Sequence, residues 1–160
     1  MQQKITPNLW FDTEAEEAAH FYLSVFENSR IGSVSRYPEG APGPTGTVMT
    51  VEFELDGQRF VGINGGPQFT FDEAVSFEIT CDTQDEVDYY WDRLSEGGEK
   101  SQCGWLKDRY GLSWQVVPTG LVEVLGDADP ERAQRAMQAM LGMRKLDIAA
   151  LRAAAGVPAA

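Results

Sequence analysis

The chain has 160 residues, a length that suits one domain with a core of its own. Its 25 acidic and 13 basic residues give a net charge of −12, which argues against nucleic acids and anionic membranes as partners because both would be repelled. No apolar run approaches the ~20 residues of a membrane span, and the N-terminal MQQKITPN lacks the apolar core of a signal peptide. With only two cysteines, Cys81 and Cys103, we expect a reduced, cytoplasmic protein.

The first half of the chain predicts a strand, a helix and three further strands. Apolar and polar residues alternate where strands are expected, and an acidic, alanine-rich stretch predicts the helix. Asp12 or Thr13 is its expected N-cap. The segment 38–46 is rich in Pro and Gly and is expected to be a loop, and Asp56-Gly57 is typical of a hairpin turn. In chain order the prediction is a strand over 5–11, a helix to about Phe26, and strands over 30–37, 47–55 and 58–64.

The second half of the chain repeats the order of predicted elements without repeating the amino-acid sequence. After an alternating strand, Asp82 or Thr83 is expected to cap a helix with a face of Val87, Tyr90, Trp91 and Leu94. Gly97-Gly98 is expected to end that helix. The predicted strands of this half span 75–81, 99–102, 105–107 and 112–117.

These patterns predict an α+β fold of paired βαβββ modules, at about 4–66 and 74–118, whose sheets form one incomplete mixed barrel within a domain over 1–120. Each strand would turn its apolar side to a helix and its other side to the interior of the barrel. Residues 121–160 are expected to form a helical extension, packed on the same domain or on a partner subunit. Its helices are predicted over 121–125, 130–143 and 147–155, with Pro130 in the first turn after an Asp129 cap.

The segment CGWLKDRYGLSWQVVP, from Cys103 to Pro118, is the most informative stretch. Tyr110-Gly111 predicts a tight turn, and the strand after it puts Leu112, Trp114 and Val116 on one face. The other face carries Ser113, Gln115 and Val117. The amide of Gln115 must line a cavity or find a buried hydrogen-bond partner.

The segment Asp108 to Gln115 resembles the D-P-D-G-N-x-x-E signature that ends modules of the vicinal-oxygen-chelate (glyoxalase/bleomycin resistance/dioxygenase) superfamily. Together with Leu9-Trp10-Phe11 and Gly65-Gly66-Pro67, it looks like the PhnB-like branch, which carries the label 3-demethylubiquinone-9 3-methyltransferase. The resemblance runs from Ile5 to about Leu151. It implies the same paired-module, glyoxalase-like fold, and a homodimer, since modules from one or two chains complete each cup in that superfamily.

The interpretation that follows is a cupped sheet that binds a small molecule without a metal or other cofactor. By the resemblance, Thr6, Ser76 and Gln115 stand where metalloenzymes of the superfamily have ligands, and two hydroxyls and an amide supply no charge to offset the dehydration of a divalent ion. Glu78 is the best candidate for a catalytic acid or base. The expected ligand-binding residues are Asn8, Trp10, Glu52, Asn64, Ser76, Glu78, Trp105 and Gln115.

Two alternatives remain open. The first is an enzyme, either a methyltransferase as the family label says or a lyase or dioxygenase with an ion held by Glu52, Glu78 and Gln115. The methyltransferase version lacks the Gly-rich turn expected after the first strand. The second alternative is a structural or interaction module that uses the C-terminal helices. Trp10 and Trp105 would serve either as stacking surfaces or as core residues.

Overall fold

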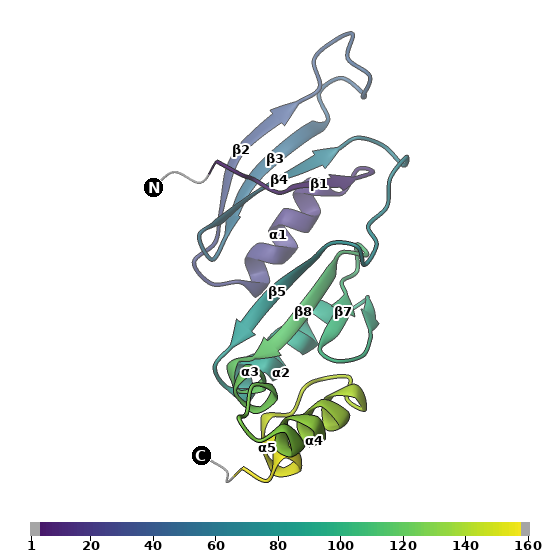
Figure 1. Cartoon of the computed structure of the whole chain (residues 1–160). Coiled ribbons are helices and arrows are strands. Elements are labelled where there is room, and N and C mark those ends of the chain that lie inside the picture. The colour runs from purple at the N-terminus through teal and green to yellow at the C-terminus, as the bar shows by residue number, and fades with distance from the viewer. Residues whose placement is uncertain (1–3, 158–160) are drawn as a thin grey trace. The chain divides into compact units, whose positions relative to one another are not determined.

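The computed structural model describes residues 4–157, and the chain divides into two compact units between Phe71 and Asp72. The first unit is a four-stranded sheet with strand order β1-β4-β3-β2 and one helix against one of its faces (Figure 1). The strands β1 and β4 are parallel, and the other pairs are antiparallel. Its elements are β1 (Asn8–Phe11), α1 (Ala15–Val25), β2 (Arg30–Arg36), β3 (Val48–Leu55) and β4 (Gln58–Asn64).

The second unit repeats this topology with the strand order β5-β8-β7-β6, and the pair β5 and β8 is again parallel. Each unit is therefore a βαβββ module with an open, mixed sheet, and the α+β fold class predicted from the sequence is confirmed. The elements are β5 (Ser76–Cys81), α2 (Gln84–Ser95), β6 (Glu99–Lys100), β7 (Trp105–Lys107) and β8 (Ser113–Pro118).

The core of the first unit lies between α1 and its sheet. Small residues of α1, among them Ala15 and Ala19, are fully buried and allow the helix to approach the strands closely. Tyr22 of α1 stacks on Phe53 of β3 with ring centroids 6.2 Å apart, and Phe53 stacks on Phe60 of β4 at 5.4 Å. Burial of large aromatic rings is the main stabilising contribution in such a layer.

The core of the second unit lies between α2 and β8, β7 and β5. Leu112, Trp114 and Val116 are all buried, as the alternation along this strand predicts. They meet α2 through its apolar residues, which include Trp91 and Leu94. The Tyr110-Gly111 turn is also as predicted, because Gly111 has a φ of +84°, which a residue with a Cβ rarely adopts.

Asp108 accounts for the amino-acid sequence of the segment before β8. This carboxylate is only 2 % exposed. Its Oδ1 accepts hydrogen bonds from the amides of Tyr110 (2.9 Å) and Leu112 (3.1 Å), and its Oδ2 accepts one from the indole of Trp114 (2.9 Å). The signature aspartate thus stabilises the turn and the core tryptophan, a structural role that the sequence pattern alone does not reveal.

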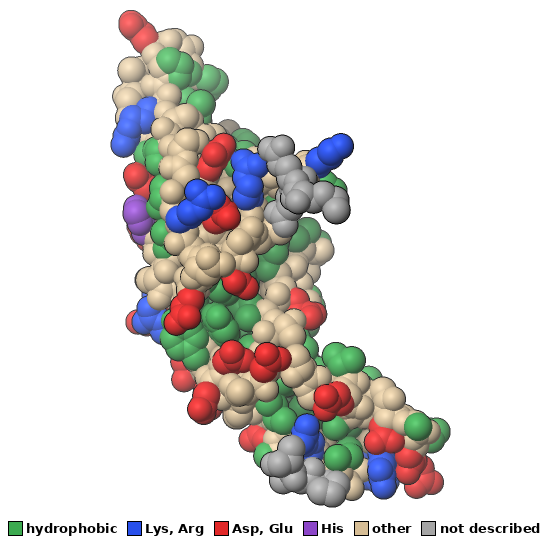
Figure 2. All heavy atoms as spheres, turned by 90° about the vertical axis from the view of Figure 1, so that its left-hand side faces the viewer, with side chains coloured by type: hydrophobic (Ala, Val, Ile, Leu, Met, Phe, Trp, Pro, Cys, Tyr) green, Lys and Arg blue, Asp and Glu red, His purple; other side chains and the backbone are tan. Residues whose placement is uncertain are grey.

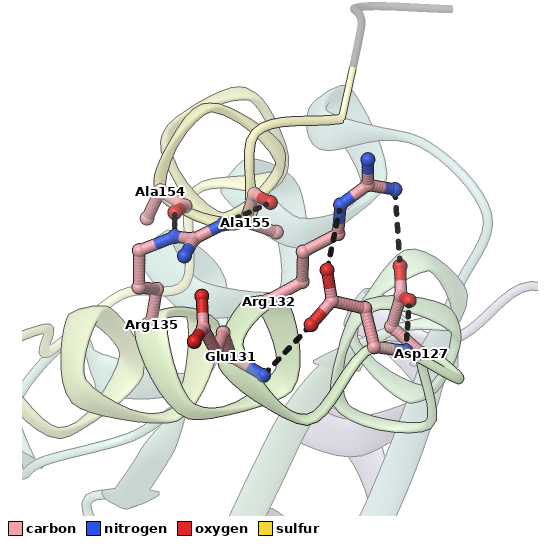
Figure 3. Close-up of polar contacts among 7 residues, drawn as sticks. Asp127, Glu131, Arg132, Arg135, Ala154 and Ala155 are labelled. Atoms are coloured by element: carbon pink, nitrogen blue, oxygen red, sulfur yellow. Dashed lines mark hydrogen bonds and ion pairs between the residues drawn. The ribbon is translucent and has the colours of Figure 1, made fainter.

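The C-terminal helices are α3 (Thr119–Leu125), α4 (Pro130–Leu141) and α5 (Ile148–Ala155). They enclose a small core of Leu121, Val124, Ala136, Leu146, Leu151 and Ala155, and Val117 of β8 packs against it. Asp129 caps α4 ahead of Pro130, as expected, and Asp147 caps α5. Arg135 of α4 donates to the carbonyls of Ala154 (3.0 Å) and Ala155 (3.2 Å), which closes the C-terminal end of α5 (Figure 3).

None of the helices in the described part of the chain is long and apolar enough to cross a membrane. Acidic side chains are spread over the face shown in Figure 2, and the basic side chains on it are interleaved with them.

Candidate functional site

The face of the second sheet that points away from α2 brings together four of the eight predicted ligand-binding residues. Register pairs Glu78 of β5 with Gln115 of β8, and Gln115 with Trp105 of β7. Residues at matching register share a face of the sheet, so the three side chains form one row across three strands. Ser76 pairs with Ser113 in the neighbouring row. The alternation of the strands is sufficient to predict this cluster.

Gln115 lies half-buried at the centre of this row, and its side-chain amide already makes one hydrogen bond within the protein. Its Nε2 donates to the hydroxyl oxygen of Ser76 over 2.9 Å. The bond orients the amide along the sheet and links two residues that the superfamily pattern places as ligands. Glu78, the candidate acid or base, is exposed. A carboxylate open to water keeps its ordinary solvation, so this position offers a polar contact.

A pocket of about 430 Å³ opens beside Trp105. Cys103, Leu106 and Ser113 contribute to its lining, together with Glu73, Glu99, Ser101, Gln102 and Lys107. The Lys107 ammonium lies 2.6 Å from the Glu73 carboxylate. This hydrogen bond lowers the pKa of Glu73 and raises the pKa of Lys107, so both groups stay charged and the pair is neutral near pH 7.

In the first unit, the open face of the sheet carries Asn8, Trp10 and Glu52. Asn8 and Glu52 both pair with Val61 of β4, so they flank the same central residue. The exposed Asn8 amide donates to the carbonyl of Thr6 over 2.9 Å. The row that contains Trp10 passes through Ile63 to Thr50, and its residues are half-buried. This face is less polar than its counterpart in the second unit.

Trp10 is fixed by the loop that follows β4. Its indole nitrogen donates to the carbonyl of Gly66 over 2.9 Å, and its ring lies directly over Gly65, where a Cβ would collide with it. Phe69 meets the ring edge-on with centroids 5.0 Å apart. The Leu9-Trp10-Phe11 and Gly65-Gly66-Pro67 motifs therefore correspond to one physical contact, in which a glycine makes room for an indole.

Asn64 lies on the opposite face from the one expected. Asn64 was expected on the same face as Trp10, but it shares a face with Phe60 and Gly62, which point toward α1. Its Oδ1 accepts from the amide of Ala15 over 2.8 Å, and its Nδ2 donates to the carbonyl of Val48 over 3.1 Å. Asn64 thus caps the first turn of α1, a role expected of Asp12 or Thr13.

A second pocket, of about 570 Å³, lies at this end of the first unit and is lined in part by Asn64. Tyr37 contributes one wall, and its hydroxyl donates to the carbonyl of Asn64 over 2.5 Å. Gly43 packs so closely on the Tyr37 ring that a Cβ there would collide with it. The loop 38–46 was predicted only as a connection, so its part in a pocket was missed because nothing local signals that contact.

The sequence comparison decides the family. The sequence profile of the 3-demethylubiquinone-9 3-methyltransferase family matches residues 3–117. The chain belongs to this family. The family segment contains both modules, and the three C-terminal helices follow it.

Solved structures agree with this assignment. A PhnB protein from Bacillus cereus is 41 % identical, with 73 % of this chain and 100 % of that chain covered and a TM-score of 0.67. The Pseudomonas aeruginosa protein PA1353 is 18 % identical, with 73 % and 98 % covered and a TM-score of 0.60. The fosfomycin resistance protein FosX from Listeria monocytogenes, solved with Mn(II) and sulfate, is 15 % identical, with 79 % and 97 % covered and a TM-score of 0.53.

The likeness to these last two proteins concerns the fold alone, which is that of the vicinal-oxygen-chelate superfamily. No protein with a curated description matches the chain. Recognition of the PhnB-like branch from its three motifs is therefore confirmed by the family segment and by the Bacillus cereus relative.

The residues at the positions expected to hold a metal do not suit a divalent ion. Ser76 and Gln115 are uncharged and hydrogen-bond each other, so neither supplies charge to replace the hydration shell. Within residues 4–157, no three His, Cys, Asp or Glu side chains lie close enough to hold an ion.

Cys81 is fully buried, and burial together with the nearby Glu86 and Asp82 raises the pKa of its thiol to about 12.

The family description implies S-adenosylmethionine, and the glycines of the first unit do not form a cradle for it. Gly62 faces Ala15 of α1, and a Cβ there would lie 3.1 Å from that side chain. Gly65 is covered by the Trp10 ring. The space that these glycines leave is filled by the protein's own side chains, and the N-terminus of α1 is closed by Asn64. The residues of this unit therefore do not fit S-adenosylmethionine.

Proposed function

We propose that the chain binds a small, uncharged, partly aromatic molecule on the open faces of its sheets, and that it does so without a metal ion. The row formed by Glu78, Gln115 and Trp105 carries the proposal. An indole offers a surface for stacking, an amide offers directional hydrogen bonds, and the neighbouring pocket of about 430 Å³ suits a single ring system.

Charge narrows the class of ligand. The pocket beside Trp105 is lined by Glu73, Glu99 and Lys107, and Lys107 is already paired with Glu73. An anionic ligand would be repelled by the remaining carboxylate of Glu99, whereas a neutral phenol or quinone would not be repelled. Binding without chemistry requires no catalytic residue, so Glu78 in this proposal contributes a rim contact.

A titration followed by 15N-edited NMR spectra tests this proposal. A panel of neutral phenols and quinones, including 2-naphthol, should shift the indole signal of Trp105 and the side-chain amide of Gln115. The variant Gln115→Leu, which removes the amide but keeps the volume, should weaken binding by about tenfold, as expected for one lost hydrogen bond. Shifts confined to residues outside the second sheet would contradict the assignment of the site.

A catalytic function is the second candidate, because the family description names a methyltransferase. A thermal-shift experiment with S-adenosylmethionine separates the two functions. A ligand that binds only the folded protein raises its melting temperature with concentration. We expect no shift at millimolar S-adenosylmethionine, and a saturable shift would favour the enzyme.

We further propose that the protein is a cytoplasmic homodimer. Light scattering on the full chain measures the mass directly, and twice the 17.7 kDa of the chain is expected. A mass equal to one chain at micromolar concentration would contradict the dimer.

A further inference from the structure

The connection between α4 and α5 contacts the loop that forms one wall of the pocket beside Trp105. The amide of Cys103 donates to the carbonyl of Met143 over 2.8 Å, and the amide of Gly104 donates to the carbonyl of Arg144 over 2.7 Å. The thiol of Cys103 lies 3.5 Å from the carbonyl of Met140. Three contacts thus join the C-terminal extension to the loop 101–104.

This loop has a backbone conformation that needs support. Cys103 has a φ of +56° and Gly104 a φ of +82°. A residue with a Cβ at positive φ is unfavourable, and it persists only where its surroundings hold it. At Gly104 a Cβ would lie 2.6 Å from the carbonyl of Val116 and 3.1 Å from Leu146, so the loop is pressed between β8 and the extension.

The connection is in turn anchored to α2. The Gln84 amide donates to the carbonyl of Leu146 over 3.1 Å and accepts from the amide of Ile148 over 2.9 Å. One helical turn later, the Asp88 carboxylate lies 2.7 Å from the Lys145 ammonium. Gln84 also donates to Asp88 over 3.1 Å. Residues four apart share a helix face, so α2 presents one continuous anchor to the connection.

The extension is a separate addition to the family fold. The family segment ends at residue 117, and the Bacillus cereus PhnB protein is covered completely by 73 % of this chain. Its helices are tied together by their own small core and by Arg135, which joins α4 to α5, and Arg132 pairs with Asp127 and Asp129 in the connection before α4 (Figure 3). A body of this kind transmits a constraint from α2 to the loop 101–104.

We propose that the segment Met143–Ile148 is a positioning element for the ligand pocket of the second sheet. It holds the loop 101–104, and through it the wall made by Ser101, Gln102 and Cys103, in the conformation that admits the ligand. The inference rests on the proposed function, because it concerns the same pocket. It adds that the pocket's shape depends on a segment outside the family fold.

The Cys103 thiol serves as a reporter of the contact, because Cys81 is buried and its pKa is about 12. The rate of reaction with Ellman's reagent should rise at least tenfold in Gln84→Ala, which loses the hydrogen bonds to both Leu146 and Ile148, and less in Lys145→Ala. Lys145→Arg should restore the rate of the native protein. Arg152→Ala is the matched control, because the Arg152 guanidinium pairs with Glu123 within the extension.

Hydrogen exchange then distinguishes positioning from stability. The probe 2-naphthol should bind only when the loop is held. At a concentration ten times its Kd, it should therefore slow hydrogen exchange of the Ile148 amide about tenfold, although Ile148 does not line the pocket. The same amide in Gln84→Ala has lost its acceptor and should exchange fast with the probe or without it.

Unchanged thiol rates in both anchor variants, or probe binding with no effect at Ile148, would overturn the positioning role. If 2-naphthol binds none of the proteins, the proposed ligand class is contradicted, and the thiol rates alone decide whether the segment holds the loop.

Discussion

The helices of the two modules are preceded by the same Asp-Thr dipeptide, but they are capped differently. Asp12-Thr13 and Asp82-Thr83 are each followed by a glutamate three residues after the threonine. In the second module, Thr83 accepts from the amide of Glu86, and the Glu86 carboxylate accepts from the amide of Thr83, which is a complete capping box. In the first module, α1 begins after Glu14, whose side chain makes no capping bond, and Asn64 supplies the cap.

The neighbouring strand accounts for the difference. Phe11 at the end of β1 pairs with Asn64, and Cys81 at the end of β5 pairs with Pro118. These two positions correspond, but only the asparagine has a side chain that reaches the helix amides with an acceptor. The same local signal therefore leads to two different caps, and a residue far away in the sequence decides which one forms.

The modules also hold a tryptophan in different ways. The Trp10 indole donates to a backbone carbonyl, that of Gly66, whereas the Trp114 indole donates to the buried carboxylate of Asp108. A charged acceptor makes the stronger bond, and its loss leaves several donors without a partner. The second module therefore depends more on a single side chain than the first.

The largest effect is expected at that side chain. Asp108→Ala should lower the free energy of unfolding by about 4 kcal/mol, because two amides and one indole lose a buried acceptor. Asp108→Asn keeps one acceptor oxygen and should cost about half as much. Urea denaturation followed by the fluorescence of the tryptophans measures both. A cost near zero for Asp108→Asn would mean that the charge is unimportant, and equal costs for the two variants would mean that a neutral amide cannot replace the carboxylate at all.

Removal of the remote cap should have the next largest effect. Asn64→Ala loses the bonds to Ala15 and Val48 and should destabilise the first module by about 2 kcal/mol. Hydrogen exchange should quicken in the first turn of α1 and not in α2. Unchanged exchange in the first turn of α1 of this variant, relative to the native protein, would contradict the role of Asn64.

The two threonines provide a matched pair. Thr83→Ala should cost about 1 kcal/mol because it removes the capping box, whereas Thr13→Ala should cost less than about 0.5 kcal/mol. Thr83→Ser keeps the hydroxyl and controls for the change in volume. Denaturation midpoints of the three variants are sufficient, and a larger cost at Thr13 would reverse the comparison.

The smallest effect concerns the pair of Asp88 and Lys145. Its hydrogen bond lowers the pKa of Asp88 and raises the pKa of Lys145. The pair's contribution is therefore present between the usual pKa values, about 4 and about 10.4, and is lost as the pH falls through the lowered pKa of Asp88 or rises through the raised pKa of Lys145.

Both side chains of this pair are more than a third exposed, at 43 % and 37 %, so the contribution should stay below about 1 kcal/mol. Comparison of Lys145→Ala with the native protein at pH 7 and pH 3 measures it. A difference in stability that does not shrink at pH 3 would contradict the ion pair.

Much of the fold is local and could be predicted. The bounds of β4 and β7 agree with the sequence patterns, and α4 ends two residues earlier than expected, at Leu141. What could not be predicted is nonlocal: Asn64 as a cap for Ala15, Gly65 as the floor under Trp10, and Cys103 bound to Met143. Such contacts join residues 40 to 55 positions apart in the sequence, about which local propensity carries no information.

Part of the candidate site could also be predicted, because it depends on local strand alternation. The second sheet's row follows from strand alternation and register, so Ser76, Glu78 and Gln115 were grouped correctly on one face. Counting the same alternation along β4 from Phe60 would have put Asn64 toward the helix. The pocket walls at Tyr37 and Gln102 come from loops, whose paths are fixed by tertiary contacts rather than by period.

The most direct test of the central claim compares a molecule and an ion at Gln115. In 15N-edited spectra of the native protein, 2-naphthol should shift the Gln115 side-chain amide and the Trp105 indole. Stoichiometric Mn(II), added to a second sample, should leave those signals unbroadened. Selective broadening at Gln115 and Ser76 by Mn(II), with no response to the phenol, would contradict a site that binds molecules rather than ions.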